Sequence, residues 1–255
     1  DNAGDIIQAV LTSKDVPYSE KLAMVNTILE KHGDSIDTDQ ATSILLGLNS
    51  AMQTPSRQST ETVAELRKLE AAVLSQAKTL ASKAAENISE ELTALADLPE
   101  GSGEITTKRA AIANQLTTIL SLASRQEQNN TSADQRIDLS KVRSTLIERV
   151  KGSELETALT TNPDFKEANL ETLAKILEHA DFQTASKLTE PQIKSLQKEL
   201  KTMQTIQAAN KELAKYSSSD ATTPSKIAKL SLAELQKPEH KALLSSLLTI
   251  LENPG

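Results

Sequence analysis

The sequence predicts an all-α protein, an elongated bundle of about 8–11 helices with one long central helix at about residues 56–98. Two observations lead to this prediction. Apolar residues recur at three- and four-residue intervals over almost all of the 255 residues, which is the period of a helix with one buried face. Gly occurs only 7 times, and no stretch alternates apolar and polar residues between turn residues as a strand does.

Three helices are predicted before Pro55. The first covers about residues 5–12. The second covers residues 17–32, because it begins at a proline and is followed by Gly33, a residue typical of helix ends. The third starts near Asp37, whose carboxylate can accept hydrogen bonds from the free amides of a first turn. Four apolar residues of the first helix are expected to face inward, namely Ile6, Ile7, Val10 and Leu11.

The longest helical pattern lies between residues 56 and 98 and contains no Gly or Pro. Its apolar residues recur about every 3.6 residues, the repeat of a straight α-helix. At about 1.5 Å per residue this predicts one continuous helix of roughly 60 Å. A helix of this length needs other helices along its apolar stripe, so we expect it at the centre. The stripe consists of Val63, Leu66, Leu69, Val73, Ala77, Leu80, Ala84, Ile88, Leu92 and Leu95.

The clearest break in the chain is the Pro-Glu-Gly-Ser-Gly segment at residues 99–103. The charge balance changes there, because residues 1–100 contain 8 basic and 16 acidic side chains, whereas residues 101–255 contain 20 and 19. We predict an acidic N-terminal helical lobe at residues 1–100, which includes the long helix, and a C-terminal helical lobe at residues 101–255. The alternative is a turn between antiparallel helices within one continuous bundle.

Several further helices are predicted after this break. Thr189 and Pro191 begin the longest of them, as its cap and a first-turn residue. The apolar seam of this helix, residues 193–203, is continued by polar Gln207 and Asn210. These indicate either the edge of the packed surface or a contact that fixes the register of a helix pair. The helices are predicted at about residues 106–126, 133–151, 153–160, 166–179, 189–216, 224–229, 232–236 and 238–252.

No pattern indicates a catalytic, cofactor-binding or metal-binding residue. The chain has no Cys, which excludes disulfides, zinc ribbons, iron–sulfur clusters and thiol catalysis. Three histidines lie too far apart for a helical metal pair, and no phosphate-binding glycine motif or serine-nucleophile motif occurs. The histidines are His32, His179 and His240.

The best metal candidates are Asp34, Asp37 and Asp39, but they fail the template of a calcium loop. The sixth position counted from Asp34 is Asp39, where such a loop has Gly. We expect these acids to stabilise helix starts instead. Aromatic residues make up only 2% of the chain, so base stacking on nucleic acid is excluded as a main mode of binding.

The sequence favours a non-catalytic helical module for protein–protein interaction, a class that includes many secreted or surface-exposed microbial proteins. We expect a protein partner, no nucleic acid, no cofactor, no membrane span and a secreted or extracytoplasmic location. The chain lacks an initiator Met, which indicates processing. The first alternative is a structural or assembly protein that acts through helix-mediated homo-oligomerisation. The second is an enzyme with an unfamiliar carboxylate site. The partner-binding residues are not determined by the sequence.

Overall fold

The computed structural model describes residues 2–53, 62–149, 157, 161, 170–178, 182–183, 186–214 and 245. Within these residues the elements are all helical, which confirms the all-α prediction and the multi-helix bundle. The helices predicted at 153–160, 224–229, 232–236 and 238–252 fall almost wholly outside the described residues. The elements are α1 (Ala3–Thr12), α2 (Tyr18–His32), η1 (Gly33–Ser35), α3 (Thr38–Gln53), α4 (Val63–Leu74), α5 (Ala77–Asp97), α6 (Glu104–Gln128), η2 (Ala133–Gln135), α7 (Leu139–Arg149), α9 (Leu170–Glu178) and α11 (Glu190–Ala214).

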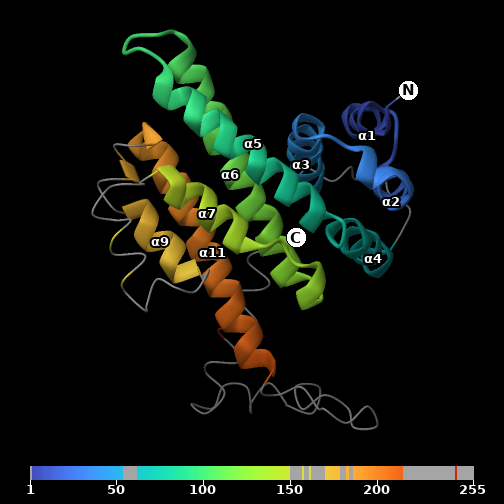
Figure 1. The fold of residues 1–255 in the computed structure, drawn as a ribbon. Coiled ribbons are helices and arrows are strands. Elements are labelled where there is room, and N and C mark those ends of the chain that lie inside the picture. The colour runs from blue at the N-terminus through green and yellow to red at the C-terminus, as the bar shows by residue number, and fades with distance from the viewer. Residues whose placement is uncertain are drawn as a thin grey trace.

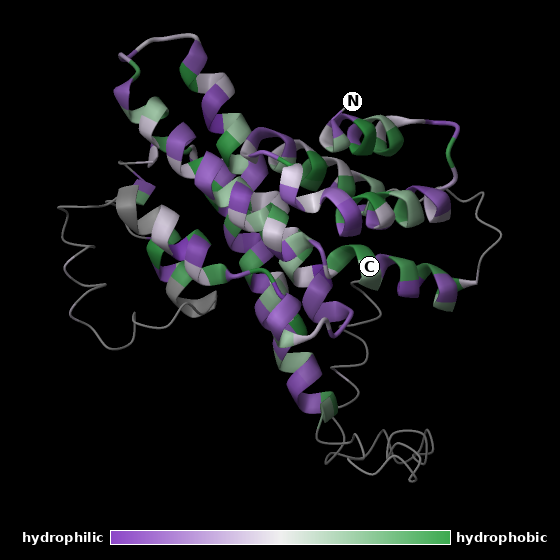
Figure 2. Cartoon of the chain, turned by 45° about the vertical axis from the view of Figure 1, so that its right-hand side comes forward, coloured by the Kyte–Doolittle hydropathy of each residue, from purple (hydrophilic) through white to green (hydrophobic). Residues whose placement is uncertain are grey.

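The helices form three layers, with the α5–α6 hairpin in the middle (Figure 1). On one side α3 packs on both helices of the hairpin, and α1 and α2 lie outside it, while α4 contacts α2 and α6. On the other side α11 packs along α6, α7 packs on α5, and α9 contacts both α7 and α11. Hydrophobic and hydrophilic residues alternate around the helices (Figure 2), as expected when each helix has a buried face.

The helix predicted at about residues 56–98 is divided in two, α4 and α5, at Ser75 and Gln76. The backbone tightens there, because the amide of Gln76 donates to the carbonyl of Val73 at 3.0 Å and the hydroxyl of Ser75 donates to that of Ala72 at 2.6 Å. The two halves share α6 as a neighbour but differ in the others: α4 lies against α2, and α5 lies against α3 and α7. No Gly or Pro marks this break, so the sequence pattern continues across it.

The central helix is α6, which has buried side chains on nearly all of its faces. Its sequence explains this position, because residues 110–124 contain no charged side chain. A helix without a charged face is suited to contact neighbours all round. Along α11 the seam Ile193, Leu196, Leu200 and Met203 is buried, and α11 packs on α6.

Polar residues extend the contact between α11 and α6 beyond the apolar seam. The side-chain amide of Asn210 donates to the backbone carbonyl of Glu127 at 2.7 Å, and that of Gln207 donates to Oε1 of Glu127 at 3.2 Å. Arg136 forms an ion pair with the same carboxylate at 2.6 Å. Both interpretations of these positions apply: Gln207 is exposed and Glu127 lies one residue before the end of α6, so the polar contact is formed at the edge of the packed surface. Such directional bonds fix the register of the pair.

Buried side chains on both sides of residue 100 belong to one contiguous cluster, which extends from Ile7 to Met203. The break at residues 99–103 is the turn between α5 and α6, and Gly101 adopts a positive φ of 85° there, a conformation that favours glycine. The division into two lobes stays a prediction. Among the described helices, none is both long enough and apolar enough to cross a membrane.

Lysine side chains connect helix ends to neighbouring elements. Lys83 of α5 donates to the carbonyls of Ile36 at 2.5 Å and Gly33 at 3.3 Å. Lys187 reaches the last carbonyls of α5 in the same way, at 3.4 to 3.5 Å. Carbonyls at a helix end lack a helical partner and carry partial negative charge, so an ammonium group stabilises them.

Lys83→Met is expected to lower the free energy of unfolding by about 1–2 kcal/mol, because it keeps most of the aliphatic stem and removes a charged donor from two carbonyls. Urea denaturation followed by circular dichroism measures this change. Lys68→Met on the exposed face of α4 is the control, expected to change stability by less than about 0.5 kcal/mol. Equal effects of the two substitutions would contradict the role of Lys83.

Candidate partner-binding surface

The described residues contain four large apolar side chains that are exposed, and all four lie in α1 to α4. Ile6 and Met24 are each 43% exposed, Leu46 is 37% exposed and Val63 is 70% exposed. Isolated exposed apolar residues are common in soluble proteins and need no explanation. Ile6 differs from the others because it lines a hollow at the junction of α1 and α2, and Met24 lies one helical turn before Ile28, which lines the same hollow.

The junction forms because α1 and α2 pack as antiparallel neighbours. At one end, the ammonium of Lys21 in α2 donates to the carbonyl of Leu11 at 3.2 Å. At the other end, Ala3 and His32 line the same hollow. The buried face of α1 consists of Gly4, Ile7, Val10 and Leu11, which leaves Ile6 outside that face.

α1 also lies very close to α3, and two glycines allow this approach. A Cβ on Gly4 would lie 2.6 Å from Cδ of Gln40, and a Cβ on Gly47 would lie 3.0 Å from Cδ1 of Leu11. α1 is therefore held against both α2 and α3. Its position, and with it the position of Ile6, is fixed by packing rather than by local sequence.

A hollow of about 600 Å³ opens between α1 and α2. Ala3, Ile6 and Ile28 supply its apolar lining, and Asn2, His32 and Ser35 supply polar groups. Met24 precedes Ile28 by one helical turn and so lies on the same face of α2. We call the hollow together with Met24 the α1–α2 groove.

Two of the three polar side chains of the groove, Asn2 and Ser35, have hydrogen-bond partners within the chain. The side chain of Asn2 accepts a hydrogen bond from the amide of Gly4 at 3.3 Å and caps α1. The hydroxyl of Ser35 donates to the carbonyl of His32 at 2.8 Å. The apolar side chains have no comparable cover, since Ile6 and Met24 remain exposed. The groove is thus an apolar surface with a polar edge, as in the core and rim of a protein interface.

The helices around the groove are acidic. Residues 2–53 contain seven Asp or Glu and only three Lys. One of the three, Lys21, donates to a backbone carbonyl. The seven acidic side chains are all exposed, namely Asp5, Asp15, Glu20, Glu30, Asp34, Asp37 and Asp39. The groove therefore lies in a field of negative charge.

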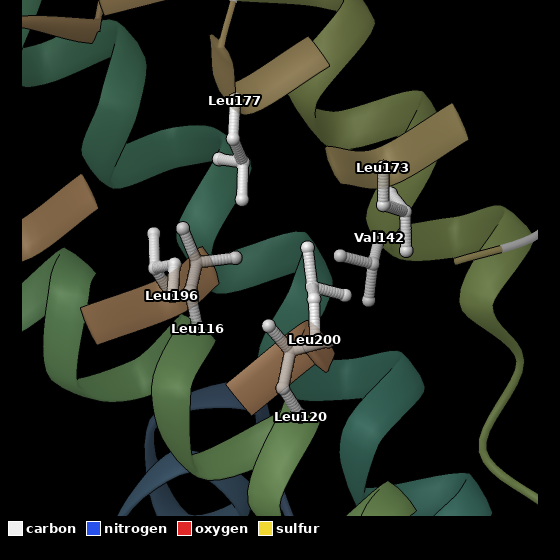
Figure 3. Close-up of a pocket in the computed structure, with 7 residues that line it drawn as sticks. All are labelled: Leu116, Leu120, Val142, Leu173, Leu177, Leu196 and Leu200. Atoms are coloured by element: carbon white, nitrogen blue, oxygen red, sulfur yellow. The ribbon is translucent and has the colours of Figure 1, made fainter. Parts of the chain in front are cut away.

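A second kind of space, an apolar cavity of about 10 Å³, lies inside the bundle between α6, α7, α9 and α11. Leucine and valine side chains point into it (Figure 3). It is about the size of one water molecule and offers no polar group, so we expect it to stay dry. This cavity is a packing defect rather than a binding site. Its lining is Leu116, Leu120, Val142, Leu173, Leu177, Leu196 and Leu200.

Buried and half-buried ionisable groups also occur, but they do not line the groove. The hydroxyl of Tyr18 donates to Oε1 of Glu70 at 2.6 Å, and burial, followed by this hydrogen bond, raises the pKa of Tyr18. Burial raises the pKa of Glu199 as well, while Lys198 and Arg125 oppose the rise. Nη1 of Arg125 is buried without a hydrogen-bond partner. None of these groups lines the groove, so they concern stability rather than the candidate surface.

Glu199→Gln is expected to stabilise the protein at pH 7 and to change its stability little at about pH 3. With a raised pKa, the folded state binds the proton of Glu199 more tightly than the unfolded state does. The wild type therefore loses stability as pH rises above the usual pKa of 4.5. Urea denaturation at both pH values measures the difference. Glu100→Gln in the exposed α5–α6 turn is the control, and an equal gain there would contradict the prediction.

The structure tests the acids and histidines singled out in the sequence. Asp37 caps α3, because the amide of Gln40 donates to its Oδ1 at 2.8 Å and the side chain of Gln40 accepts from the amide of Asp37 at 3.2 Å. No group of three or more His, Asp or Glu that could hold a metal occurs among the described residues. His32 lies at the groove, whereas His179 and His240 lie outside the described residues.

The inward placement predicted for Ile6 is wrong, since this side chain is largely exposed. Ile6 follows the helical spacing of its neighbours, but α1 turns Ile7 and Val10 toward the core instead. The sequence pattern did not single out Met24, which lies outside the buried face of α2 formed by Leu22, Val25 and Leu29. An apolar residue outside the buried face of an amphipathic helix was the sequence signal that could have identified Met24 as exposed. Comparisons of the chain with protein-family models, with curated proteins and with solved structures give no match.

Proposed function

We propose that the chain is a non-catalytic helical module that binds a protein partner through the α1–α2 groove. The observation that carries the proposal is the exposure of Ile6 and Met24 along a junction that also contains a hollow of about 600 Å³. Removing apolar surface from water stabilises a complex by roughly 25 cal/mol per Å². A groove between two helices suits the apolar face of a further helix, a common mode of peptide recognition.

The alternative of homo-oligomerisation through the α11 seam has less support. Ile193, Leu196, Leu200 and Met203 are buried within the single chain, and α11 packs along α6. A second chain would have to displace α6 to reach them. The groove, in contrast, is accessible without any rearrangement. The secreted or surface-exposed microbial location stays a prediction.

The test compares the double variant Ile6→Asp/Met24→Asp with Leu46→Asp, which places one acidic side chain on another exposed apolar residue of the same layer. Proteins cross-linked to each form in the source organism are quantified by mass spectrometry. We expect one partner to be recovered equally by the wild type and Leu46→Asp and at least about tenfold less by the double variant. Circular dichroism confirms that all three are folded. A partner recovered equally by all three would refute the groove as the binding surface.

A further inference from the structure

We propose that the occupant of the α1–α2 groove is a basic amphipathic helix of the partner protein. This inference rests on the proposed function and adds the chemistry of the partner. It follows from two properties of the groove, the spacing of its apolar residues and the charge of its surroundings.

The apolar residues of the groove form two short rows. Met24 and Ile28 are four residues apart on α2, and Ala3 and Ile6 are three residues apart on α1. Such pairs lie about 5–6 Å apart along a helix. Apolar residues in the stripe of an amphipathic helix have the same spacing, because they also recur every three or four residues. A helix lying along the junction therefore places successive apolar side chains against both rows.

Acidic residues flank the groove residues along the chain, and we take them as the edge of the groove. Asp5 is adjacent to Ile6, Glu20 lies one turn before Met24, and Asp34 is adjacent to Ser35, which lines the hollow. Lys31 and His32 are the basic side chains here, His32 in the lining itself, and the ammonium of Lys21 donates to the carbonyl of Leu11. Charges within about 10 Å interact at moderate ionic strength, so lysines or arginines beside an incoming apolar stripe are attracted.

The same charge pattern disfavours a second copy of this chain. In a symmetric dimer each subunit uses the same surface, so the acidic edges of two grooves would face each other. Like charges brought together across an interface reduce affinity. An acidic or neutral amphipathic helix would offer the same apolar contacts but would not be attracted by the acidic side chains beside the groove. The charge therefore selects a basic helix among the helices that fit.

The experiment uses the full chain and two synthetic peptides of about 18 residues, long enough to form several helical turns. Both carry the same leucine stripe, and the polar positions are lysine in one and glutamate in the other. Binding is followed by fluorescence anisotropy of a labelled peptide at low and high salt. We expect the basic peptide to bind at least about tenfold more tightly than the acidic one, and to lose most of this advantage at about 1 M salt.

Two sets of variants locate the binding. Ile6→Ser/Met24→Ser removes the apolar contacts without adding charge and should weaken binding of the basic peptide at least about tenfold, whereas Leu46→Ser should leave it unchanged. Glu20→Gln/Asp34→Asn should lower the affinity for the basic peptide about two- to fivefold. The control Asp97→Asn/Glu100→Gln makes the same change in net charge at the α5–α6 turn and should leave the affinity unchanged.

The outcomes separate the inference from the proposed function. Equal binding of both peptides, lost in Ile6→Ser/Met24→Ser, would overturn the basic partner while supporting the groove. Binding that this variant does not change would overturn both. A photo-cross-linking amino acid at position 6 identifies the occupant directly. Cross-links to the basic peptide support the inference, whereas cross-links to a second copy or to residues 238–252 of the same chain overturn it.

Discussion

Leu116→Ala is expected to lower the free energy of unfolding by about 3–5 kcal/mol, the upper part of the range for leucine truncation in a core. Leu116 lies on the central helix and is 2% exposed. It also lines the existing cavity of about 10 Å³ (Figure 3). Truncation enlarges a space that is already present, and the surrounding helices cannot close it because α6 contacts neighbours on several sides. Urea denaturation followed by circular dichroism measures the loss.

Two further substitutions test the reasoning about this cavity. Val142→Ile adds one methylene beside the cavity, so it should be neutral or should stabilise the protein by up to about 1 kcal/mol. Leu46→Ala removes the same atoms as Leu116→Ala from an exposed position and should cost less than about 1 kcal/mol. A cost below about 2 kcal/mol for Leu116→Ala would show that the four helices close around the truncated side chain.

Gln126→Leu is expected to lower the free energy of unfolding by about 2–4 kcal/mol, because the buried side-chain amide of Gln126 forms hydrogen bonds with three backbone groups. Its Nε2 donates to the carbonyls of Leu74 at 2.7 Å and Gln135 at 3.2 Å, and its Oε1 accepts from the amide of Ile137 at 2.7 Å. The side chain is 1% exposed. Leucine preserves most of the volume and leaves these groups unpaired, at about 1–3 kcal/mol for each group that water does not reach.

The effect of Gln126→Leu has a local signature besides the loss of stability. The amide of Ile137 should exchange its hydrogen faster, because it loses its acceptor. Gln126→Glu retains an acceptor, so it should protect this amide better than leucine does, although a buried charge makes it destabilising as well. Gln128→Leu, two residues further along α6, is the control. Unchanged exchange at Ile137 in Gln126→Leu would contradict the network.

Features that depend on neighbouring residues in the chain were predicted well. The cap at Asp37 involves Gln40, three residues away, and α11 begins at Glu190, directly after Thr189 and with Pro191 in its first turn, as expected. Helix propensity, capping and periodicity act over one or two turns, so the sequence carries them explicitly. Most helix positions in the described residues were therefore predictable to within a few residues.

Features that depend on distant residues were not predictable. Helix α4 ends at Leu74, and the carbonyl of Leu74 is satisfied by Gln126, 52 residues further along the chain. The candidate groove was missed for the same reason, since periodicity assigned Ile6 to the buried face. Whether Ile6 is covered depends on the orientation that Gly4 and Gly47 allow α1 to adopt against α3.

The sequence by itself determined that the chain forms amphipathic helices, where most of them begin and end, and that the first hundred residues are acidic. Only the tertiary structure decided that α6 is the central helix, that the long pattern divides at Ser75, and that Ile6 and Met24 remain exposed along one junction. The physical reason is range. A helix arises from bonds and side-chain contacts within about four residues, whereas burial of a face depends on which other helix packs against it.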